Sequence, residues 1–192
     1  MKARESGMPD EATWKTFFHP EEALAALGLD PETRLAVEFG CGYGTFTLEA
    51  ARIIRGMVLG FDIESGLVDL CRQKSAQSGL ANARFERRDF VADGTGLADH
   101  TADYVMLFNI LHAEDPQILL REARRILAPG GTLAVMHWNY DPQTPRGPSM
   151  DIRPRPEDCR RWVKDAGFTE IGPNIHLPPW HYGFTAKAKQ IN

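Results

Sequence analysis

Three glycines at alternate positions, Gly40, Gly42 and Gly44, directly follow a short apolar run. Because glycine has no side chain, such a segment can turn sharply and bring its backbone close to a ligand. The spacing departs from the G-x-G-x-x-G pattern of dinucleotide sites, since Thr45 stands where the last small residue is expected. The run before the turn contains Glu38, whose carboxylate would repel a diphosphate and attract an ammonium or sulfonium group. The turn therefore predicts a ligand that is cationic at this point.

Two further acidic residues end apolar runs. Asp62 follows Gly40 by about 20 residues, the separation at which an acidic side chain commonly accepts hydrogen bonds from ribose hydroxyls. Asp89, or the backbone beside it, can meet an exocyclic amine, and Ile63 and Phe90 can flank a purine ring. Each acid could instead cap the following segment, and Ile63 and Phe90 could be apolar for packing reasons alone. A ribose, an adenine and a cationic amino-acid end together describe S-adenosylmethionine.

The elements that must position these residues alternate regularly. The hydrophobic periodicity predicts strands at about 35–39, 57–63, 83–90, 103–110 and 132–138, helices at 20–27, 45–54, 66–78, 117–127 and 156–167, and two terminal strands within 169–177 and 182–188. Strands that alternate with helices of this length predict an α/β fold, in which helices cover both faces of a mostly parallel sheet. Ligands of such sheets bind at the carboxyl ends of the strands, where the glycines and acids fall.

Two histidines are candidate catalytic residues at the same edge. His112 could act as a base near neutral pH, or it could cap the following helix. His137 and Trp138 end a predicted strand and face the crevice only in one register, since a slip of one residue would reverse both.

The substrate is expected to contact three further segments. The proline-rich stretch 139–156 predicts an irregular loop over the site, in which Arg153 could hold a carboxylate or phosphate or could be a solvated surface residue. Tyr182 could line the same pocket or close the last hairpin. The arm of residues 1–18 contains Trp14 among other aromatic residues, and we expect it to fold over the site as a lid that excludes water.

Composition restricts the class of protein. With 192 residues, 43% of them hydrophobic, the chain is expected to form one domain over 1–192. A net charge of −4 disfavours a nucleic-acid partner.

The three cysteines are widely spaced, so neither a disulfide framework nor a metal site is expected. Cys41 lies within the glycine turn and is expected to contact the cofactor. No run is long enough to span a membrane or act as a signal peptide, which predicts a soluble cytoplasmic protein.

The segments VEFGCGYG, GFDIES, RRDF, DYVMLFNILH and LREARRILAPGGTLAV resemble the ordered motifs of class I S-adenosylmethionine-dependent methyltransferases. They are most similar to the small-molecule branch grouped as methyltransferase type 11, over about residues 33–138. The resemblance implies a Rossmann-like sheet of seven strands in the order 3-2-1-4-5-7-6, with the last strand antiparallel. It also implies methyl transfer from S-adenosylmethionine, which leaves S-adenosylhomocysteine.

Several site residues follow from this resemblance. Glu38 would lie near the methionine part of the cofactor, and the glycine turn would pass beneath it. Asp62 would bind the ribose, Asp89 would meet the adenine amine, and Asn109 would lie beside the methyl group.

The acceptor is expected to be a small molecule of unknown identity. Amino methylation of nucleic acid is disfavoured, because Asn109–His112 replaces the N/D-P-P-Y/F stretch of enzymes that perform it. Two alternatives stay open: a nicotinamide-dependent oxidoreductase on a similar sheet, and a cofactor-binding module without turnover.

Overall fold

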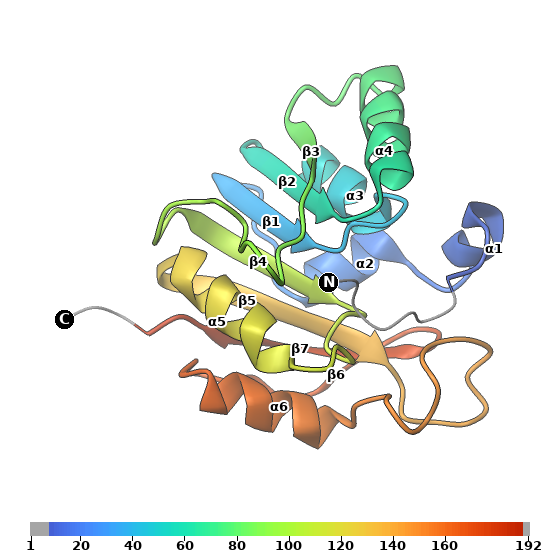
Figure 1. The fold of residues 1–192 in the computed structure, drawn as a ribbon, viewed down its shortest axis with the longest axis vertical. Helices are drawn as coiled ribbons and strands as arrows, with labels where there is room; N and C mark the ends of the chain where they lie inside the picture. The colour runs from blue at the N-terminus through green and yellow to red at the C-terminus, as the bar shows by residue number, and fades with distance from the viewer. Residues whose placement is uncertain (1–7, 190–192) are drawn as a thin grey trace.

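Residues 8–189 are described by a computed structural model, in which a seven-stranded sheet runs through the molecule (Figure 1). Its order is β3-β2-β1-β4-β5-β7-β6. The strands are β1 (Leu35–Phe39), β2 (Met57–Asp62), β3 (Ala83–Arg87), β4 (Ala102–Phe108), β5 (Leu127–Trp138), β6 (Ile175–Leu177) and β7 (His181–Lys187). Neighbours pair in parallel from β3 to β5, whereas β7 runs antiparallel to β5 and β6. This arrangement confirms the expected fold class, strand order and antiparallel last strand.

Helices fill the connections between strands. They are α1 (Glu11–Lys15), α2 (Pro20–Ala26), α3 (Thr45–Ile53), α4 (Ser65–Gln77), α5 (Pro116–Ile126) and α6 (Pro156–Asp165). The start of α5 is set locally, since Asp115 accepts a hydrogen bond from the Gln117 backbone and Pro116 occupies the first turn. Asp10 caps the unexpected short helix α1 in the same way.

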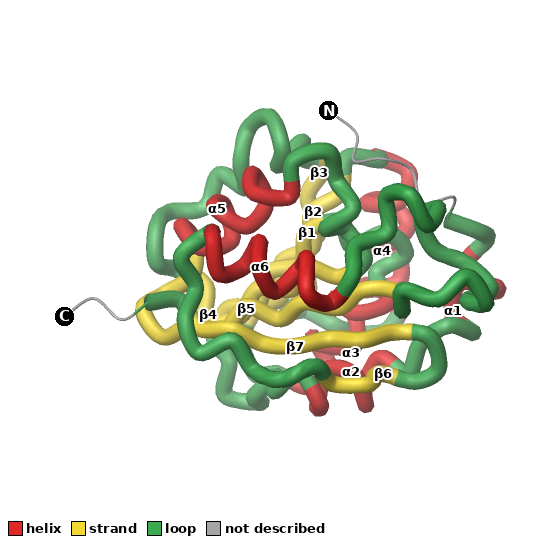
Figure 2. The backbone as a smooth tube through the Cα atoms, turned by 90° about the horizontal axis from the view of Figure 1, so that it is seen from below, coloured by secondary structure: helices red, strands yellow, loops and turns green. Residues whose placement is uncertain are grey.

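The two faces of the sheet bury separate cores (Figure 2). Along β4, Val105 and Leu107 belong to the core that α5 and α6 cover, while Tyr104 and Met106 belong to the core beneath α2 and α3. This alternation follows from the two-residue period of a strand. Because all its central strands are covered on both sides, the sheet exposes only its edges for binding.

Part of the N-terminal arm belongs to the second core. Phe17 and Phe18 are buried, and the Phe18 ring lies 4.8 Å from Trp14 and 5.3 Å from Phe46. A lid as long as 1–18 therefore disagrees with the packing, because removing Phe17 and Phe18 would open the core. Residues 1–7 of that expected lid lie outside the described part of the chain.

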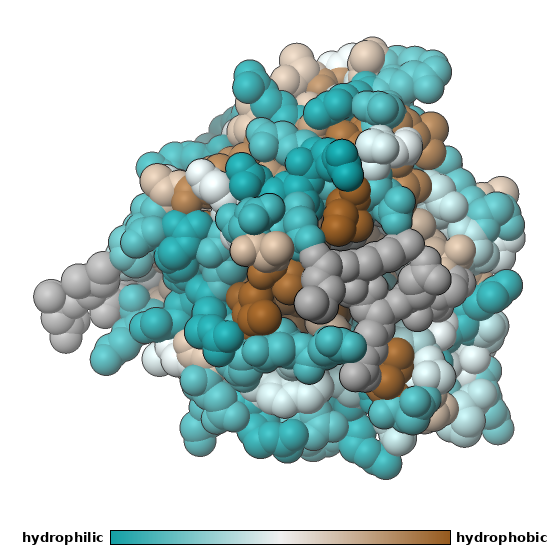
Figure 3. All heavy atoms as spheres, viewed as in Figure 1, coloured by the Kyte–Doolittle hydropathy of each residue, from teal (hydrophilic) through white to brown (hydrophobic). Residues whose placement is uncertain are grey.

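The surface is mostly hydrophilic on the face shown in Figure 3, with small apolar areas near its centre. Among the described residues, no helix has the length and apolar character that crossing a bilayer requires.

Candidate functional site

The three glycines form a tight turn at the carboxyl end of β1. All three have positive φ angles, +75° at Gly40, +53° at Gly42 and +77° at Gly44, which residues with side chains rarely adopt. The backbone N–H groups of Gly40 and Cys41 both donate to the Phe61 carbonyl of β2, at 2.8 and 2.9 Å. A Cβ at Gly40 would lie 2.9 Å from Ile110. The turn thus brings bare backbone to the sheet edge.

Asp62 holds this turn to the end of β2. One carboxylate oxygen accepts from the Gly42 backbone N–H at 2.8 Å, and the other accepts from the Glu64 backbone N–H at 3.0 Å. The side chain is 8% exposed. Because a carboxylate oxygen can accept two hydrogen bonds, each oxygen keeps capacity for a ribose hydroxyl.

Glu38 lies beneath the turn instead of beside an open crevice. It is buried, and its carboxyl accepts a hydrogen bond from the Thr47 hydroxyl of α3. Burial raises the pKa of Glu38 to about 8, and the nearby Asp62 charge acts in the same direction. The carboxyl therefore holds a proton at neutral pH. This differs from the expected standing negative charge, because the sequence did not show that the group is enclosed.

The residues expected at the adenine have local partners as well. Asp89 accepts a hydrogen bond from the Ala92 backbone at 3.1 Å, so it caps the turn after β3, as its alternative interpretation expected. The Phe90 ring is buried and lies 5.2 Å from Phe39, within the core. Ile63 is half-buried at the end of β2.

Asn109 follows β4 with a strained backbone. Its φ of +53° is uncommon for a residue with a side chain. Its backbone N–H donates to the Met136 carbonyl at 2.8 Å, while its side-chain oxygen is buried and accepts no hydrogen bond from any described residue. Such a conformation and an unpaired buried acceptor are typical of functional positions.

The two candidate catalytic histidines are neighbours. His112 and His137 have ring centroids 5.5 Å apart, and both are buried. Burial, together with the charge of His112, holds the pKa of His137 well below its ordinary range. His137 is consequently neutral and enclosed between His112 and the Tyr182 ring, which lies 6.4 Å away.

The expected substrate-binding aromatics are mainly structural in this arrangement. Trp138 is fully buried and points to the opposite face from His137. Trp14 is half-buried, 6.3 Å from Trp138. The Tyr182 hydroxyl contacts the Cys159 thiol and donates to the Pro154 carbonyl, both at 3.3 Å. Trp138 and Tyr182 therefore differ from the expectation that they line an open pocket.

Arg153 organises the loop after β5 instead of presenting its guanidinium to a ligand. It is 8% exposed. Its nitrogens donate to the carbonyls of Asn139, Asp141, Arg146 and Pro148 and to the Thr144 hydroxyl. These bonds use the donors that a substrate carboxylate would need, which disagrees with the expected role. The chain folds back on Arg153. The carbonyls that accept its hydrogen bonds belong to residues several positions earlier in the sequence, so no local sequence pattern indicated them.

Sequence reasoning missed a contact between the N-terminal arm and the glycine turn. The Tyr43 hydroxyl donates to the Pro9 carbonyl at 2.9 Å, and Met8 lies next to Gly42. Lys74 of α4 donates to the Tyr43 carbonyl at 2.9 Å and pairs with Glu11 at 2.7 Å. The sequence feature that could have indicated this contact is Tyr43, because it places a large side chain between two turn glycines where local packing does not require one.

Cys41 is buried below the turn beside Cys71, whose thiol donates to the Gly42 carbonyl at 3.2 Å. A hydrogen bond that the Cys41 thiol donates to Cys71, together with burial, holds the pKa of Cys41 well above its ordinary range. Cys41 is therefore an unreactive packing residue whose backbone serves the turn.

Several groups therefore lie together at this sheet edge. They are the left-handed glycine turn, the carboxyl groups of Glu38 and Asp62 beneath it, the unpaired amide oxygen of Asn109 and the neutral His137. Within residues 8–189, no group of three or more His, Cys, Asp or Glu side chains could hold a metal ion. The arrangement can bind a ligand through backbone and ribose-type contacts and can exchange a proton through an imidazole.

Comparison with known proteins identifies the family of this arrangement. Residues 36–131, half of the chain, match the family model described as methyltransferase domain. The match runs from β1 to the start of β5, so it includes the glycine turn, Asp62, Asp89, Asn109 and His112.

One solved structure and two curated relatives extend the comparison. An S-adenosylmethionine-dependent methyltransferase from Aquifex aeolicus has a TM-score of 0.81 at 22% identity, with 93% of this chain and 94% of that chain covered, and shares the fold. An uncharacterized 37.1 kDa protein in transposon TN4556 of Streptomyces fradiae is 30% identical over 77% of this chain and 45% of its own length. The 23S rRNA (uracil(1939)-C(5))-methyltransferase RlmD of Xanthomonas campestris is 39% identical over 37% of this chain and 16% of its own length. The chain thus spans less than half the length of either curated relative.

Proposed function

The chain belongs to this family of methyltransferase domains, and we propose that it transfers the methyl group of S-adenosylmethionine to a small-molecule acceptor. The family match agrees with the cofactor that the sequence motifs imply, S-adenosylmethionine, and does not favour the nicotinamide alternative. The observation that carries the proposal is the left-handed glycine turn fixed to Asp62 at the sheet edge. We also propose that residues 1–192 act as one domain in the cytoplasm.

The described residues fit this cofactor. In the proposal, the bare backbone of Gly40–Gly44 passes beneath its methionine part, and the free acceptor sites of Asp62 receive its ribose hydroxyls. The backbone around Asp89 and the half-buried Ile63 border the adenine. When bound, the cofactor supplies a methyl group that is already activated by its sulfonium.

The protein's part in the reaction is mainly positioning. Alignment of the acceptor with the methyl group makes the step effectively unimolecular, which can supply most of the acceleration. The Asn109 amide oxygen is proposed to orient the reacting groups, because it is buried without a described partner. His112 is proposed to remove a proton where the acceptor requires it, and the neutral His137 to position His112.

RNA is a second acceptor class, favoured only by the similarity to RlmD over 71 residues. That similarity covers 37% of this chain, and the net charge of −4 provides no general attraction for phosphate. The small-molecule acceptor is therefore the proposal retained.

Calorimetric titration tests cofactor binding directly. We expect S-adenosylhomocysteine to bind and NADH to give no heat. Asp62→Asn keeps the shape of the side chain but removes its charge, and should weaken binding roughly tenfold, as loss of a charge-assisted hydrogen bond commonly does. The matched control is Asp93→Asn, an exposed aspartate after β3. Tight binding of NADH with none of S-adenosylhomocysteine would overturn the proposal.

A further inference from the structure

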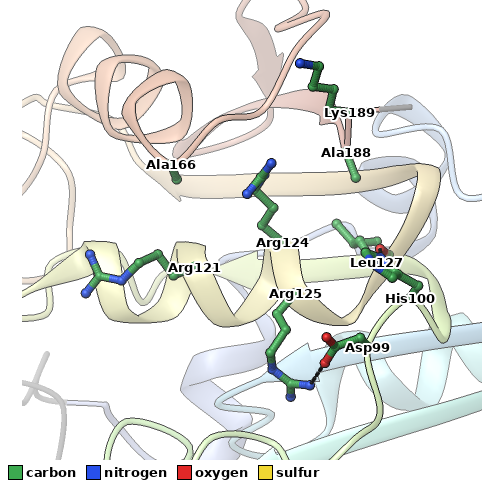
Figure 4. Close-up of a pocket in the computed structure, with 9 residues that line it drawn as sticks. All are labelled: Asp99, His100, Arg121, Arg124, Arg125, Leu127, Ala166, Ala188 and Lys189. Atoms are coloured by element: carbon green, nitrogen blue, oxygen red, sulfur yellow. Dashed lines mark hydrogen bonds and ion pairs between the residues drawn. The ribbon is translucent and has the colours of Figure 1, made fainter. Parts of the chain in front are cut away.

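A cavity of about 520 Å³ lies at the opposite edge of the sheet from the glycine turn. Figure 4 shows the residues that line it. It is lined by Asp99 and His100 before β4, by the last turns of α5, by Leu127 at the start of β5 and by Ala188 after β7. These are the amino ends of β4 and β5, and the antiparallel β7 ends at the same edge. The cavity is therefore separate from the candidate cofactor site.

Positive side chains dominate this cavity. Its lining includes Arg121, Arg124, Arg125 and Lys189, together with His100 and only one acidic residue, Asp99. The whole chain has a net charge of −4. A cavity lined by one sign of charge raises the local concentration of ions of opposite sign.

The aspartate in the lining is already neutralised. Arg125 pairs with Asp99 at 2.6 Å, as the dashed line in Figure 4 shows, and with Glu122 at 2.7 Å. It also donates to the Leu97 carbonyl at 2.8 Å. Arg125 is thus a fixed part of the wall. Arg121 lies 3.7 Å from the Asp115 carboxylate, which leaves Arg124 and Lys189 as the lining cations to be explained.

Helix capping does not explain those remaining cations. Cations near a helix C-terminus often balance its partial negative charge. Here, however, the last carbonyls of α5 accept from the backbone N–H groups of His100 and Thr101, at 3.0 and 2.8 Å. The end of α6 is closed by the Gly167 and Phe168 N–H groups. Backbone donors therefore occupy these carbonyls at both helix ends.

Arg124 and Lys189 form no ion pair with any residue of the range 8–189. Figure 4 shows Arg124 extending from α5 toward Ala166, at the end of α6, and Ala188, which follows β7. Its guanidinium passes beside Gly167, where an added Cβ would lie 3.2 Å from Arg124 Nε. The lack of a side chain at Gly167 leaves room for this placement.

We propose that this cavity binds a small organic phosphate with at least two negative charges. The guanidinium of Arg124 would hold phosphate oxygens through two parallel hydrogen bonds, and Lys189 would add a second positive charge. Leu127, Ala166 and Ala188 provide an apolar surface for the organic part. The volume lies within the range of small-molecule sites.

Titration calorimetry with uridine diphosphate tests the proposal on the full chain. Saturating S-adenosylhomocysteine is added so that the candidate cofactor site cannot take up the nucleotide. We expect binding that weakens at least tenfold in Arg124→Ala and roughly threefold in Lys189→Ala, since the arginine provides the bidentate contact. Higher salt should weaken it further.

Arg84→Ala is the matched control, because Arg84 is an exposed arginine of β3 outside the cavity. It should leave the dissociation constant within about twofold, a difference of well under 1 kcal/mol by the tenfold-per-1.4 kcal/mol relation. Absence of heat from uridine diphosphate, or equal binding by wild type and Arg124→Ala, would overturn the proposal. Binding of an RNA oligonucleotide without binding of uridine diphosphate would overturn it as well.

Discussion

At the scale of single residues, the structure changes the meaning of Glu38 most. Its place before the glycine turn predicts a fixed negative charge, yet the side chain is enclosed and accepts a hydrogen bond from the Thr47 hydroxyl. Burial favours the protonated form, which raises its pKa from 4.5 to about 8. The free energy of unfolding should therefore depend on pH.

The sign of this dependence follows from proton binding. Between about pH 4.5 and 8 the folded protein keeps the Glu38 proton that the unfolded chain releases, so stability falls as pH rises across this window. Below about 4.5 both states are protonated and the contribution is constant.

Glu38→Gln should remove this dependence, because its amide stays neutral. As pH rises from 5 to 8.5, the free energy of unfolding of the variant, measured with urea, should increase relative to that of wild type. Glu86→Gln, an exposed β3 carboxyl, is the control. Parallel pH dependence of Glu38→Gln and wild type would show that Glu38 does not keep its proton.

At the scale of elements, the N-terminal arm divides into two parts. Phe17 and Phe18 belong to the core, whereas Met8–Lys15 lies against the glycine turn and α4. A part that touches the turn mainly through a few polar contacts can open without unfolding the domain. Because the Trp14 ring packs against Phe18 and Trp138 of the core, the segment that can act as a lid ends before Trp14.

Lys74→Ala tests this lid. The change removes the contacts of Lys74 with Glu11 and with the Tyr43 carbonyl, and should loosen the arm over the turn. We expect the dissociation constant of S-adenosylhomocysteine to rise roughly three- to tenfold, which matches the loss of hydrogen bonds to a charged group. The thermal midpoint should change little.

Lys164→Ala, at an exposed site on α6, should leave binding unchanged. An unaltered dissociation constant in Lys74→Ala would mean that the arm does not close over the cofactor.

At the scale of the whole molecule, the sheet separates two sets of charges. The carboxyl edge holds the glycine turn and its acids, and the amino edge holds the basic cavity. The net charge of −4 provides no general electrostatic attraction for a nucleic acid.

A turnover assay follows from this charge distribution. We expect S-adenosylhomocysteine to be released with members of a small-molecule panel and not with ribosomal RNA, measured against a reaction without acceptor. Release with RNA alone would contradict the small-molecule proposal, and cofactor binding without release from either class would favour a binding module.

The sequence by itself determined the α/β alternation, the strand order through its motifs, and the glycine turn. These features depend on short-range periodicity and on backbone conformations that glycine permits, so neighbouring residues carry the information. The N-cap of α5 was equally local, since Asp115 and Pro116 act within one turn.

Only the tertiary structure decided which side chains meet. Arg153 looked like a ligand for a carboxylate, but packing surrounds it with carbonyls of its own loop. Arg121 and Arg124 are exposed on α5, and they border a cavity because β7 and α6 end beside them. Such partnerships join residues distant in sequence, and burial then sets their charge and hydrogen bonding, which no local pattern records.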